Sequence, residues 1–382
     1  MGWAKDGNYE TGYRNRFLFR ETERMTHFLQ DILRQPAEIR RTIDFLRGPG
    51  QHRLAEAAAA VRNSHHVYLT GIGSSWHAAL TAGPLFSLGA RPVYMQDAAE
   101  LLQFATVPSG AVIIVISRTG RSVEIVHLLA KARECGALVI GVTNSEDGPL
   151  AREAQIPIVV ATKFDHGISV NTYSTVALAA GALAAASVGA HDYTLSDAVL
   201  DAVMESDRAI AGWQRQIADT VWLLPGTVCY FLGRGSSLGS CHEARLLWEE
   251  GAKSPATAMG TGGFRHGPQE IVAEGSRFGM WIDGARMRGQ DLAVARDLGR
   301  LGASVMLIGQ DIPEDAADLV FRLPKIPSHW QFLIDIIPAQ LAAERLARLA
   351  GVDCDSFRLC SYIVEDEWGL LHEHAGAPKG EN

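Results

Sequence analysis

Short runs of apolar residues alternate with longer amphipathic segments along most of the chain. The runs of the first half are rich in β-branched residues, which is typical of strands that are covered on both faces. These runs are His66–Leu69, Pro92–Tyr94, Val112–Ile116, Leu138–Val142 and Ile156–Val160. Between them, Ser122–Glu134 carries its apolar residues on one helical face and ends at Gly136. This order of strands and helices predicts a doubly wound parallel sheet.

The same pattern restarts after a helical connector over residues 196–218. The strands expected there are Val228–Leu232, Phe278–Ile282, Ser304–Ile308 and Leu319–Leu323. The helices expected there are Ser240–Ala252, Gln290–Leu301 and Gln331–Leu349. The chain therefore belongs to the α/β class, with two tandem doubly wound parallel-sheet domains and flanking helices.

Two further helices are indicated outside the alternating pattern. Apolar spacing over Thr26–Leu46 is helical, and we expect Pro36 to break or restart that helix. The Ala-rich stretch Val176–Val188 indicates a buried helix that is too short to span a bilayer.

A seven-residue segment occurs twice, once in each half. Leu69-Thr70-Gly71-Ile72-Gly73-Ser74-Ser75 returns as Phe231-Leu232-Gly233-Arg234-Gly235-Ser236-Ser237, 162 residues later. An offset of this length indicates a duplicated domain, because solenoid repeats have much shorter periods. We divide the chain into a polar extension (1–24), an N-terminal helical segment (25–48), a first domain (49–195), a helical connector (196–218), a second domain (219–350) and a C-terminal tail (351–382).

The composition limits the classes of function. The chain has 382 residues, 47% of them hydrophobic, and a net charge of −8, which argues against a general nucleic-acid binder. Five scattered cysteines without a C-x-x-C pair favour a reducing compartment. The N-terminus lacks the apolar core of a signal peptide. We therefore expect a cytoplasmic protein with neither nucleic acid nor membrane as a partner.

Two glycine- and serine-containing loops are candidates for anion binding. Gly71-Ile72-Gly73-Ser74-Ser75 follows a strand and precedes a helix, where free backbone N–H groups attract anions, although an ordinary strand-to-helix turn also explains it. Trp76 stands where a dinucleotide-binding motif has its third glycine, so a nicotinamide cofactor is disfavoured and none is expected.

The second loop is Ser117-Arg118-Thr119-Gly120-Arg121-Ser122, again before a helix. Three hydroxyls and the helix N-terminus suit a phosphate monoester. The alternative is a simple N-cap by Ser122, which needs only one hydroxyl. The corresponding place in the second half reads Asp283-Gly284-Ala285-Arg286, without such hydroxyls, so the first domain is the expected anion binder.

These loops, duplicated as described, together with Gly263-Phe264-Arg265-His266-Gly267-Pro268, resemble the sugar isomerase (SIS) domain family over residues 25–364. The likeness is to the isomerase half of glucosamine-6-phosphate synthase and to amino-sugar-phosphate isomerase/deaminases of the tagatose and galactosamine branch. The resemblance implies a phosphate site, a proton-shuttling Glu250 and a ring-opening His266 that can reach a partner subunit, hence a homodimer. The implied phosphate-binding residues are Gly73, Ser74, Ser75, Ser117, Arg118 (through its backbone), Thr119 and Ser122.

The chain also departs from the synthase pattern. Gly2 stands where the synthase has the nucleophilic cysteine of its glutaminase domain, so glutamine-dependent transfer is not expected. Leu247 replaces a lysine three residues before the glutamate, and Cys360 lies near the position of the imine-forming lysine of the synthase tail. A thiol cannot form that imine, whereas isomerisation by a proton shuttle needs only the carboxylate.

Each candidate side chain has a plainer interpretation. Glu250 could be a solvated helix end and His266 part of a turn, while His372-Glu373-His374 lacks further metal ligands, so no metal is expected. A poorly solvated carboxylate is basic enough to move a proton between C1 and C2 of a sugar. We therefore predict a cofactor-independent isomerase or deaminase of a hexose or hexosamine 6-phosphate. The alternative is a non-catalytic sugar-phosphate sensor.

Overall fold

The computed structural model describes residues 25–189, 195–366 and 369–370. Within them the strands form two parallel five-stranded sheets, in the orders β2-β1-β3-β4-β5 and β7-β6-β8-β9-β10. The two orders correspond strand for strand, which confirms two doubly wound α/β units of one topology. The strands are β1 (Val67–Thr70), β2 (Tyr94–Met95), β3 (Val112–Ser117), β4 (Leu138–Thr143), β5 (Ile156–Val159), β6 (Cys229–Gly233), β7 (Ala256–Gly260), β8 (Arg277–Trp281), β9 (Ser304–Gly309) and β10 (Leu319–Arg322).

All nine predicted strands are present within two residues of their expected bounds. The edge strand β7 was not predicted. It consists of Ala, Thr, Ala, Met and Gly and is only half-buried, so it carries neither an apolar run nor many β-branched residues. Its position follows from parallel pairing with β6 rather than from its own composition.

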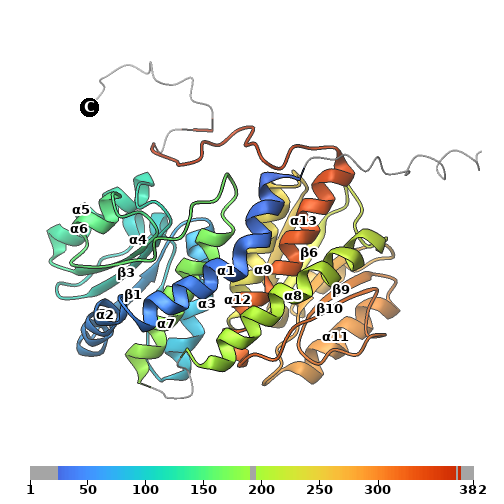
Figure 1. The fold of residues 1–382 in the computed structure, drawn as a ribbon, viewed down its shortest axis with the longest axis horizontal. Helices are drawn as coiled ribbons and strands as arrows, with labels where there is room; N and C mark the ends of the chain where they lie inside the picture. Colours follow the sequence, from blue (N-terminus) through green and yellow to red (C-terminus); the bar gives the residue numbers. More distant parts are fainter. Residues whose placement is uncertain (1–24, 190–194, 367–368, 371–382) are drawn as a thin grey trace, which may run out of the picture.

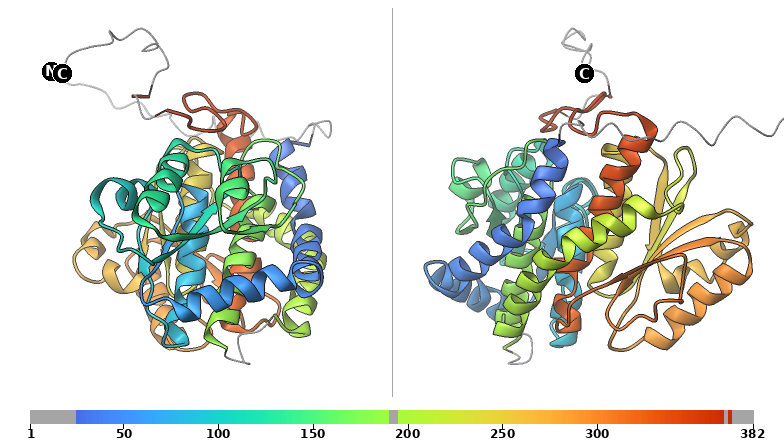
Figure 2. Two further views of the ribbon diagram at one scale, coloured as in Figure 1. Left: turned by 90° about the vertical axis from the view of Figure 1, so that its left-hand side faces the viewer. Right: turned by 45° about the vertical axis from the view of Figure 1, so that its right-hand side comes forward.

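The molecule is layered along its long axis (Figure 1). A central layer of helices lies between the sheets, and a smaller group of helices covers the outer face of each sheet (Figure 2). The helices are α1 (His27–Arg47), α2 (Gln51–Asn63), α3 (Ser74–Leu88), α4 (Ala98–Phe104), α5 (Val123–Cys135), α6 (Pro149–Glu153), α7 (Asn171–Val188), α8 (Asp197–Asp219), α9 (Ser237–Glu250), α10 (Thr261–Phe264), α11 (Arg288–Arg300), α12 (Phe332–Asp335) and α13 (Ile337–Ala350), with 3₁₀ turns η2 (Pro268–Ile271) and η3 (Ser328–Trp330).

One large hydrophobic core spans the central layer. It joins side chains of α1, α3, α7, α9 and α13 with the inner faces of both sheets, whereas separate clusters lie beneath α5 and α11. The Ala-rich helix α7 is almost wholly buried, as its sequence predicted, and its small side chains allow close packing against α3. The two units therefore share one interior.

The prediction that Pro36 breaks the first helix is wrong. The helix α1 continues through Pro36, which is itself buried. A proline inside a helix costs about 3 kcal/mol because it removes one backbone hydrogen bond. The apolar face that contains Phe28, Ile32 and Ile39 is buried in the core, and each such side chain contributes about 1.5–3 kcal/mol. Packing of α1 against α7 and α8 outweighs the local defect.

The segment after α13 leaves the second unit and crosses toward the first along one edge of the molecule (Figure 1). Residues 351–364 have no regular secondary structure, yet they contribute to the main cavity described below. No helix among the described residues is long and apolar enough to cross a membrane. The predicted polar extension over residues 1–24 lies outside the described residues.

Candidate active site

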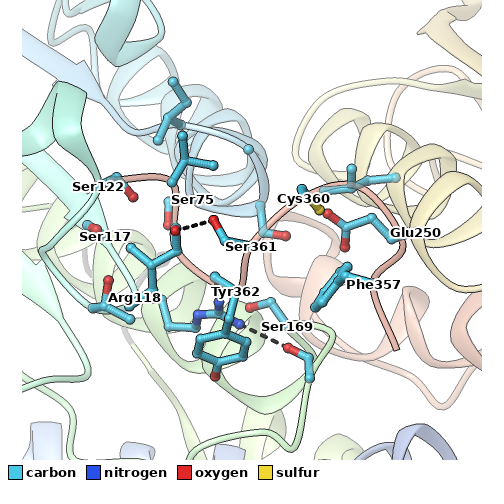
Figure 3. Close-up of a pocket in the computed structure, with 18 of the residues that line it drawn as sticks. Ser75, Ser117, Arg118, Ser122, Ser169, Glu250, Phe357, Cys360, Ser361 and Tyr362 are labelled. Atoms are coloured by element: carbon cyan, nitrogen blue, oxygen red, sulfur yellow. Dashed lines mark hydrogen bonds between the residues drawn. The ribbon is translucent and has the colours of Figure 1, made fainter. Parts of the chain in front are cut away.

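A cavity of about 280 Å³ lies where the first unit, α9 and the C-terminal segment meet. Both predicted anion-binding loops contribute to it from one side and Glu250 from the other, with the C-terminal segment between them (Figure 3). The loops converge because they follow β1 and β3, which are neighbours in a parallel sheet, so their carboxyl ends meet at one edge. All seven predicted phosphate-binding residues thus line one cavity with Glu250: Gly73, Ser74, Ser75, Ser117, Arg118, Thr119 and Ser122.

The loop after β3 holds its backbone with two of its own hydroxyls. Ser117 Oγ accepts a hydrogen bond from Gly120 N at 3.0 Å, and Thr119 Oγ1 accepts one from Arg121 N at 3.3 Å. Ser122 occupies the N-cap position of α5, but its side chain makes no capping hydrogen bond. The N-cap interpretation of Ser122 therefore lacks its hydrogen bond, and this hydroxyl remains available to a ligand.

The hydroxyls of the first loop have different surroundings. Ser74 donates to Glu243 Oε1 at 2.9 Å, and the other oxygen of Glu243 contacts His77 Nδ1 at 2.7 Å. Glu243 is fully buried between α3 and α9, so this cluster ties the loop to the second unit. Ser75 is also buried, but no hydrogen bond of the described residues engages its hydroxyl, which lines the cavity.

The side chain of Arg118 is directed to the protein rather than into the loop. Its guanidinium donates to the carbonyl of Gly167 at 3.2 Å and to that of Tyr362 at 3.1 Å, and it stacks 4.1 Å from the centre of the Tyr362 ring. Arg118 thereby binds the C-terminal segment next to the cavity (Figure 3). The side chain of Arg118 is thus engaged by other residues, and its role toward a phosphate through the backbone stays a prediction.

Glu250 is the last residue of α9, and its carboxylate faces the cavity opposite the hydroxyls (Figure 3). Burial, assisted by the negative charge of Glu243, raises the pKa of Glu250 to about 7. Arg118 and Lys253 oppose that rise. A carboxylate with this pKa is both ionised in part and basic at neutral pH, which suits proton transfer to and from carbon.

Several cavity residues in the C-terminal segment could not be predicted from the sequence. Phe357, Ser361, Tyr362, Ile363 and Val364 all line the cavity. They lie more than 100 residues from Glu250 along the chain, and only the path of the segment after α13 brings them there. Cys360 was singled out in the sequence, and its sulfur lies beside Glu250 (Figure 3).

His266 does not line this cavity. It is exposed between α10 and η2, where His266 N donates to Gly263 O at 3.0 Å and Gly267 adopts a φ of 122°. A turn of this kind requires glycine at position 267. Within one chain, therefore, the two predicted catalytic residues are not brought together.

In the corresponding loop of the second unit, a carboxylate of the loop itself occupies the backbone N–H groups. Asp283 accepts hydrogen bonds from the backbone N–H groups of Ala285, Arg286 and Met287, at 3.2, 3.1 and 3.0 Å. In the first unit the equivalent loop has no such carboxylate, and hydroxyls surround the helix start. The two copies therefore present different groups to the cavity at this position of the fold.

The described residues contain no candidate metal site. Among them, no group of three or more His, Cys, Asp or Glu side chains could hold a metal ion. The candidate His372-Glu373-His374 lies outside the described residues.

Comparison with known proteins supports the resemblance seen in the sequence. Residues 60–186 match the family model of the SIS domain. The chain is 28% identical over 355 residues to a glutamine–fructose-6-phosphate aminotransferase (isomerizing) of Pyrobaculum aerophilum, covering 89% of this chain and 58% of that protein. A protein of the same description from Pyrococcus horikoshii is 25% identical over 342 residues, covering 86% of this chain and 56% of its own length. The chain thus spans less than two thirds of these relatives.

Solved structures share the fold. The C-terminal domain of glucosamine-fructose-6-phosphate aminotransferase from Francisella tularensis has a TM-score of 0.76 at 19% identity, covering 86% of this chain and 97% of that one. Glucosamine-6-phosphate deaminase from Thermotoga maritima has a TM-score of 0.73 at 21% identity, covering 89% and 99%. Tagatose-6-phosphate ketose/aldose isomerase from Escherichia coli has a TM-score of 0.73 at 20% identity, covering 87% and 96%. Residues 60–186 therefore match the SIS domain, and the chain as a whole shares the fold of these solved structures.

Proposed function

We propose that the protein is a phosphosugar isomerase or amino-sugar-phosphate deaminase acting on a hexose or hexosamine 6-phosphate. The observation that carries this proposal is one cavity that contains both a hydroxyl-rich helix start and a buried carboxylate with a pKa near 7. The first group suits a phosphate monoester, and the second suits a proton carrier. The names of the relatives, which include isomerases and a deaminase, support the same class.

The phosphate is proposed to lie against the loop after β3 and the start of α3. The hydroxyls of Ser75 and Ser122 have no hydrogen-bond partner among the described residues, and both line the cavity. Ser117 and Thr119 hold the loop backbone, which orients its amide groups. The doubly charged ester would therefore receive hydrogen bonds from Ser75, Ser122 and backbone N–H groups.

Glu250 is proposed to shuttle the proton. In the open-chain aldose it removes the proton from C2, while the hydroxyl proton moves from O2 to O1 and an enediol forms. Return of the carbon-bound proton to C1 gives the ketose. With nitrogen on C2 the same transfer yields a ketimine, and water then displaces ammonia. Neither route uses glutamine, and neither needs a lysine imine, in keeping with the thiol of Cys360 beside Glu250.

Ring opening is assigned to His266 of a partner subunit in a homodimer. Its exposed position, away from the cavity of its own chain, suits a residue that acts in trans. Imidazole exchanges protons near neutral pH, as protonation of a ring oxygen requires. We also propose a cytoplasmic location, which the free state of Cys135, Cys229, Cys241, Cys354 and Cys360 supports.

The direct test is turnover of a panel of substrates: fructose, glucosamine, tagatose and galactosamine 6-phosphates, with ketose and ammonia measured separately. We expect turnover by the unmodified protein and its loss in Glu250→Gln, with retained binding measured by calorimetry. Glu249→Gln is the matched control, because Glu249 pairs with Arg245 on the same helix end and does not line the cavity. Binding of these esters without turnover, unaltered by Glu250→Gln, would show a sugar-phosphate sensor instead.

A further inference from the structure

A second cavity, of about 690 Å³, lies at the other end of the central helices α3 and α9. Its walls come from the second-unit loop that repeats the glycine–serine motif, the loop after β8, the turn before α12 and the C-terminal half of α3. It has more than twice the volume of the cavity proposed as the active site, about 280 Å³. Nothing in the proposed reaction uses it.

This cavity is the counterpart of the first one in the duplicated fold. Gly73, Ser74, Ser75, Gly167 and Ser169 line the first, and the residues 162 positions later line the second: Gly235, Ser236, Ser237, His329 and Gln331. The two glycines have similar left-handed φ angles of 56° and 53°. The relation also runs in reverse, since Leu246 and Glu250 of the first cavity correspond to Pro84 and Leu88 of the second.

The counterpart lacks the groups that the proposed reaction needs. Leu88 stands in place of Glu250, so the counterpart position has no carboxylate to carry a proton. Asp283 also lines this cavity, but its carboxylate already accepts the backbone N–H groups of its own loop, so a phosphate could not lie there as it would in the first unit. The second cavity thus lacks both groups on which the proposed isomerisation depends.

Several polar groups in the second cavity remain open to a ligand. Ser236 is only 7% exposed, and no hydrogen bond of the described residues engages its hydroxyl. The helix α9 begins beside it without a side-chain cap. The guanidinium of Arg286 is in no ion pair of the described part of the chain, and Arg234 contacts Asp291 only through Nε, at 2.7 Å. Ser236, Arg234 and Arg286 all line the cavity.

Another part of the wall is apolar. It consists of Leu80, Pro84 and Leu88 on α3, together with Met95 and Leu238. Volumes of 300–1,000 Å³ with mainly apolar walls and few polar groups are typical of sites for small organic ligands. A ligand that matches both parts of the wall combines an anionic group with an apolar body.

We propose that this cavity is a ligand-binding site for an amphipathic organic anion, held at the start of α9 by Ser236, Arg234 and Arg286 with its apolar body against α3. A carboxylate, a sulfonate or a phosphate ester supplies the same anionic chemistry. A hexose phosphate has no apolar body and belongs to the first cavity.

Two helices connect this site with the proposed active site. The helices α3 and α9 pack against each other in opposite directions, so each has one end in each cavity. The start of α3 carries Ser74 and Ser75, and the end of α9 carries Glu250. A ligand that shifts either helix at the second cavity therefore acts on both parts of the first. Such coupling is reciprocal, so each ligand changes the affinity of the other by the same factor.

The test uses the full chain and 8-anilinonaphthalene-1-sulfonate, an amphipathic anion whose fluorescence rises on transfer from water to an apolar site. We expect saturable binding that Arg286→Ala weakens about 10-fold or more, since a charged hydrogen bond is lost. Ser236→Ala should weaken it several-fold, and Leu88→Asp should nearly abolish it. Arg300→Ala is the matched control, because Arg300 is exposed on α11 and does not line the cavity. Circular dichroism verifies that each variant is folded.

Two results would overturn the proposal. One is an unchanged dissociation constant of the dye in both Arg286→Ala and Ser236→Ala. The other is simple competition, in which the apparent dissociation constant of the dye keeps rising as fructose 6-phosphate is added. That result would place the dye in the first cavity. Two coupled sites are supported if fructose 6-phosphate changes the dissociation constant of the dye up to a limit, and if the dye changes that of fructose 6-phosphate by the same factor. The catalytic proposal fails separately, through absence of turnover, and that result leaves the dye experiment unaffected.

Discussion

The two units have the same strand order, yet the loops after β3 and β8 present different groups at corresponding places. After β3 the helix start is surrounded by hydroxyls, of which Ser122 makes no capping bond, whereas after β8 the carboxylate of Asp283 accepts three backbone N–H groups. At the far end of the facing helix, Glu250 in one cavity corresponds to Leu88 in the other. One backbone plan thus places different groups in its two cavities, according to a few side chains at helix ends.

The largest expected effect comes from Glu250. Glu250→Gln should lower kcat by roughly 10²–10⁴-fold, because the amide cannot accept a proton while its shape is nearly the same. Sugar-phosphate affinity should change little, since the phosphate contacts lie across the cavity (Figure 3). Steady-state kinetics with calorimetric binding checks this. Leu88→Glu is not expected to create turnover in the second cavity, and turnover by a Leu88→Glu, Glu250→Gln double variant would contradict the comparison.

The pH profile should show the same carboxylate. The pKa of Glu250 is raised to about 7, so the base is lost on protonation and kcat/KM should fall about tenfold per unit below pH 7. The phosphate has its own pKa near 6, so a limb centred at 6 would assign the loss to the substrate. Because the pKa of Glu250 is raised in the folded state, the protonated carboxyl group stabilises the fold at low pH. This contribution to the free energy of unfolding is lost as the pH rises through 7. Glu250→Gln should therefore raise Tm more at pH 8 than at pH 5.

The hydroxyls of the first unit should differ in their importance. Ser122→Ala should weaken fructose 6-phosphate binding by about 10- to 100-fold, because a hydrogen bond to a charged group is lost. Ser74→Ala should weaken it less, since the Ser74 hydroxyl donates to Glu243 rather than to the cavity. Calorimetric titration of both variants measures the difference. Equal losses would mean that Ser74 turns to the ligand on binding.

The built-in carboxylate of the second unit should act on stability. Asp283→Ala removes the acceptor of three backbone N–H groups and should lower the free energy of unfolding by about 1–2 kcal/mol, as for a lost helix cap. Urea denaturation followed by circular dichroism gives this value. Asp297→Ala is the control, since Asp297 is two-thirds exposed and should change stability by less than about 0.5 kcal/mol. Similar values for the two variants would refute the capping role.

A stability effect of similar size is expected at the two equivalent glycines. Gly73→Ala and Gly235→Ala should each cost roughly 1–2 kcal/mol, because both positions have positive φ and neither added methyl group meets another atom. Only Gly73→Ala is expected to reduce sugar-phosphate affinity as well. Thermal unfolding and calorimetry test the pair. Stability losses that differ by more than about 1 kcal/mol would show that the two loops are not conformational equivalents.

Most of the fold could be predicted from the sequence because parallel strands buried on both faces are written as apolar runs. The exceptions include the edge strand β7 and the continuous α1, since pairing with β6 and burial of one helix face depend on distant residues. The single helix expected over Gln331–Leu349 is another, because the structure has the separate helices α12 and α13 there. The two candidate anion-binding loops and Glu250, singled out through local motifs and a family resemblance, line one cavity. The C-terminal residues of the cavity could not, because their segment has no regular pattern.

The sequence by itself determined the two α/β units, the hydroxyl cluster before α5 and the absence of such a cluster after β8. These are local features, set by apolar periodicity and by residue types at strand ends. Only the tertiary structure decided which groups share a cavity: Glu250 opposite Ser122, Arg118 bound to the Tyr362 segment, and Leu88 as the counterpart of Glu250. The physical reason is that the antiparallel packing of α3 and α9 brings together residues that are far apart in the chain. Local sequence patterns do not specify such long-range contacts.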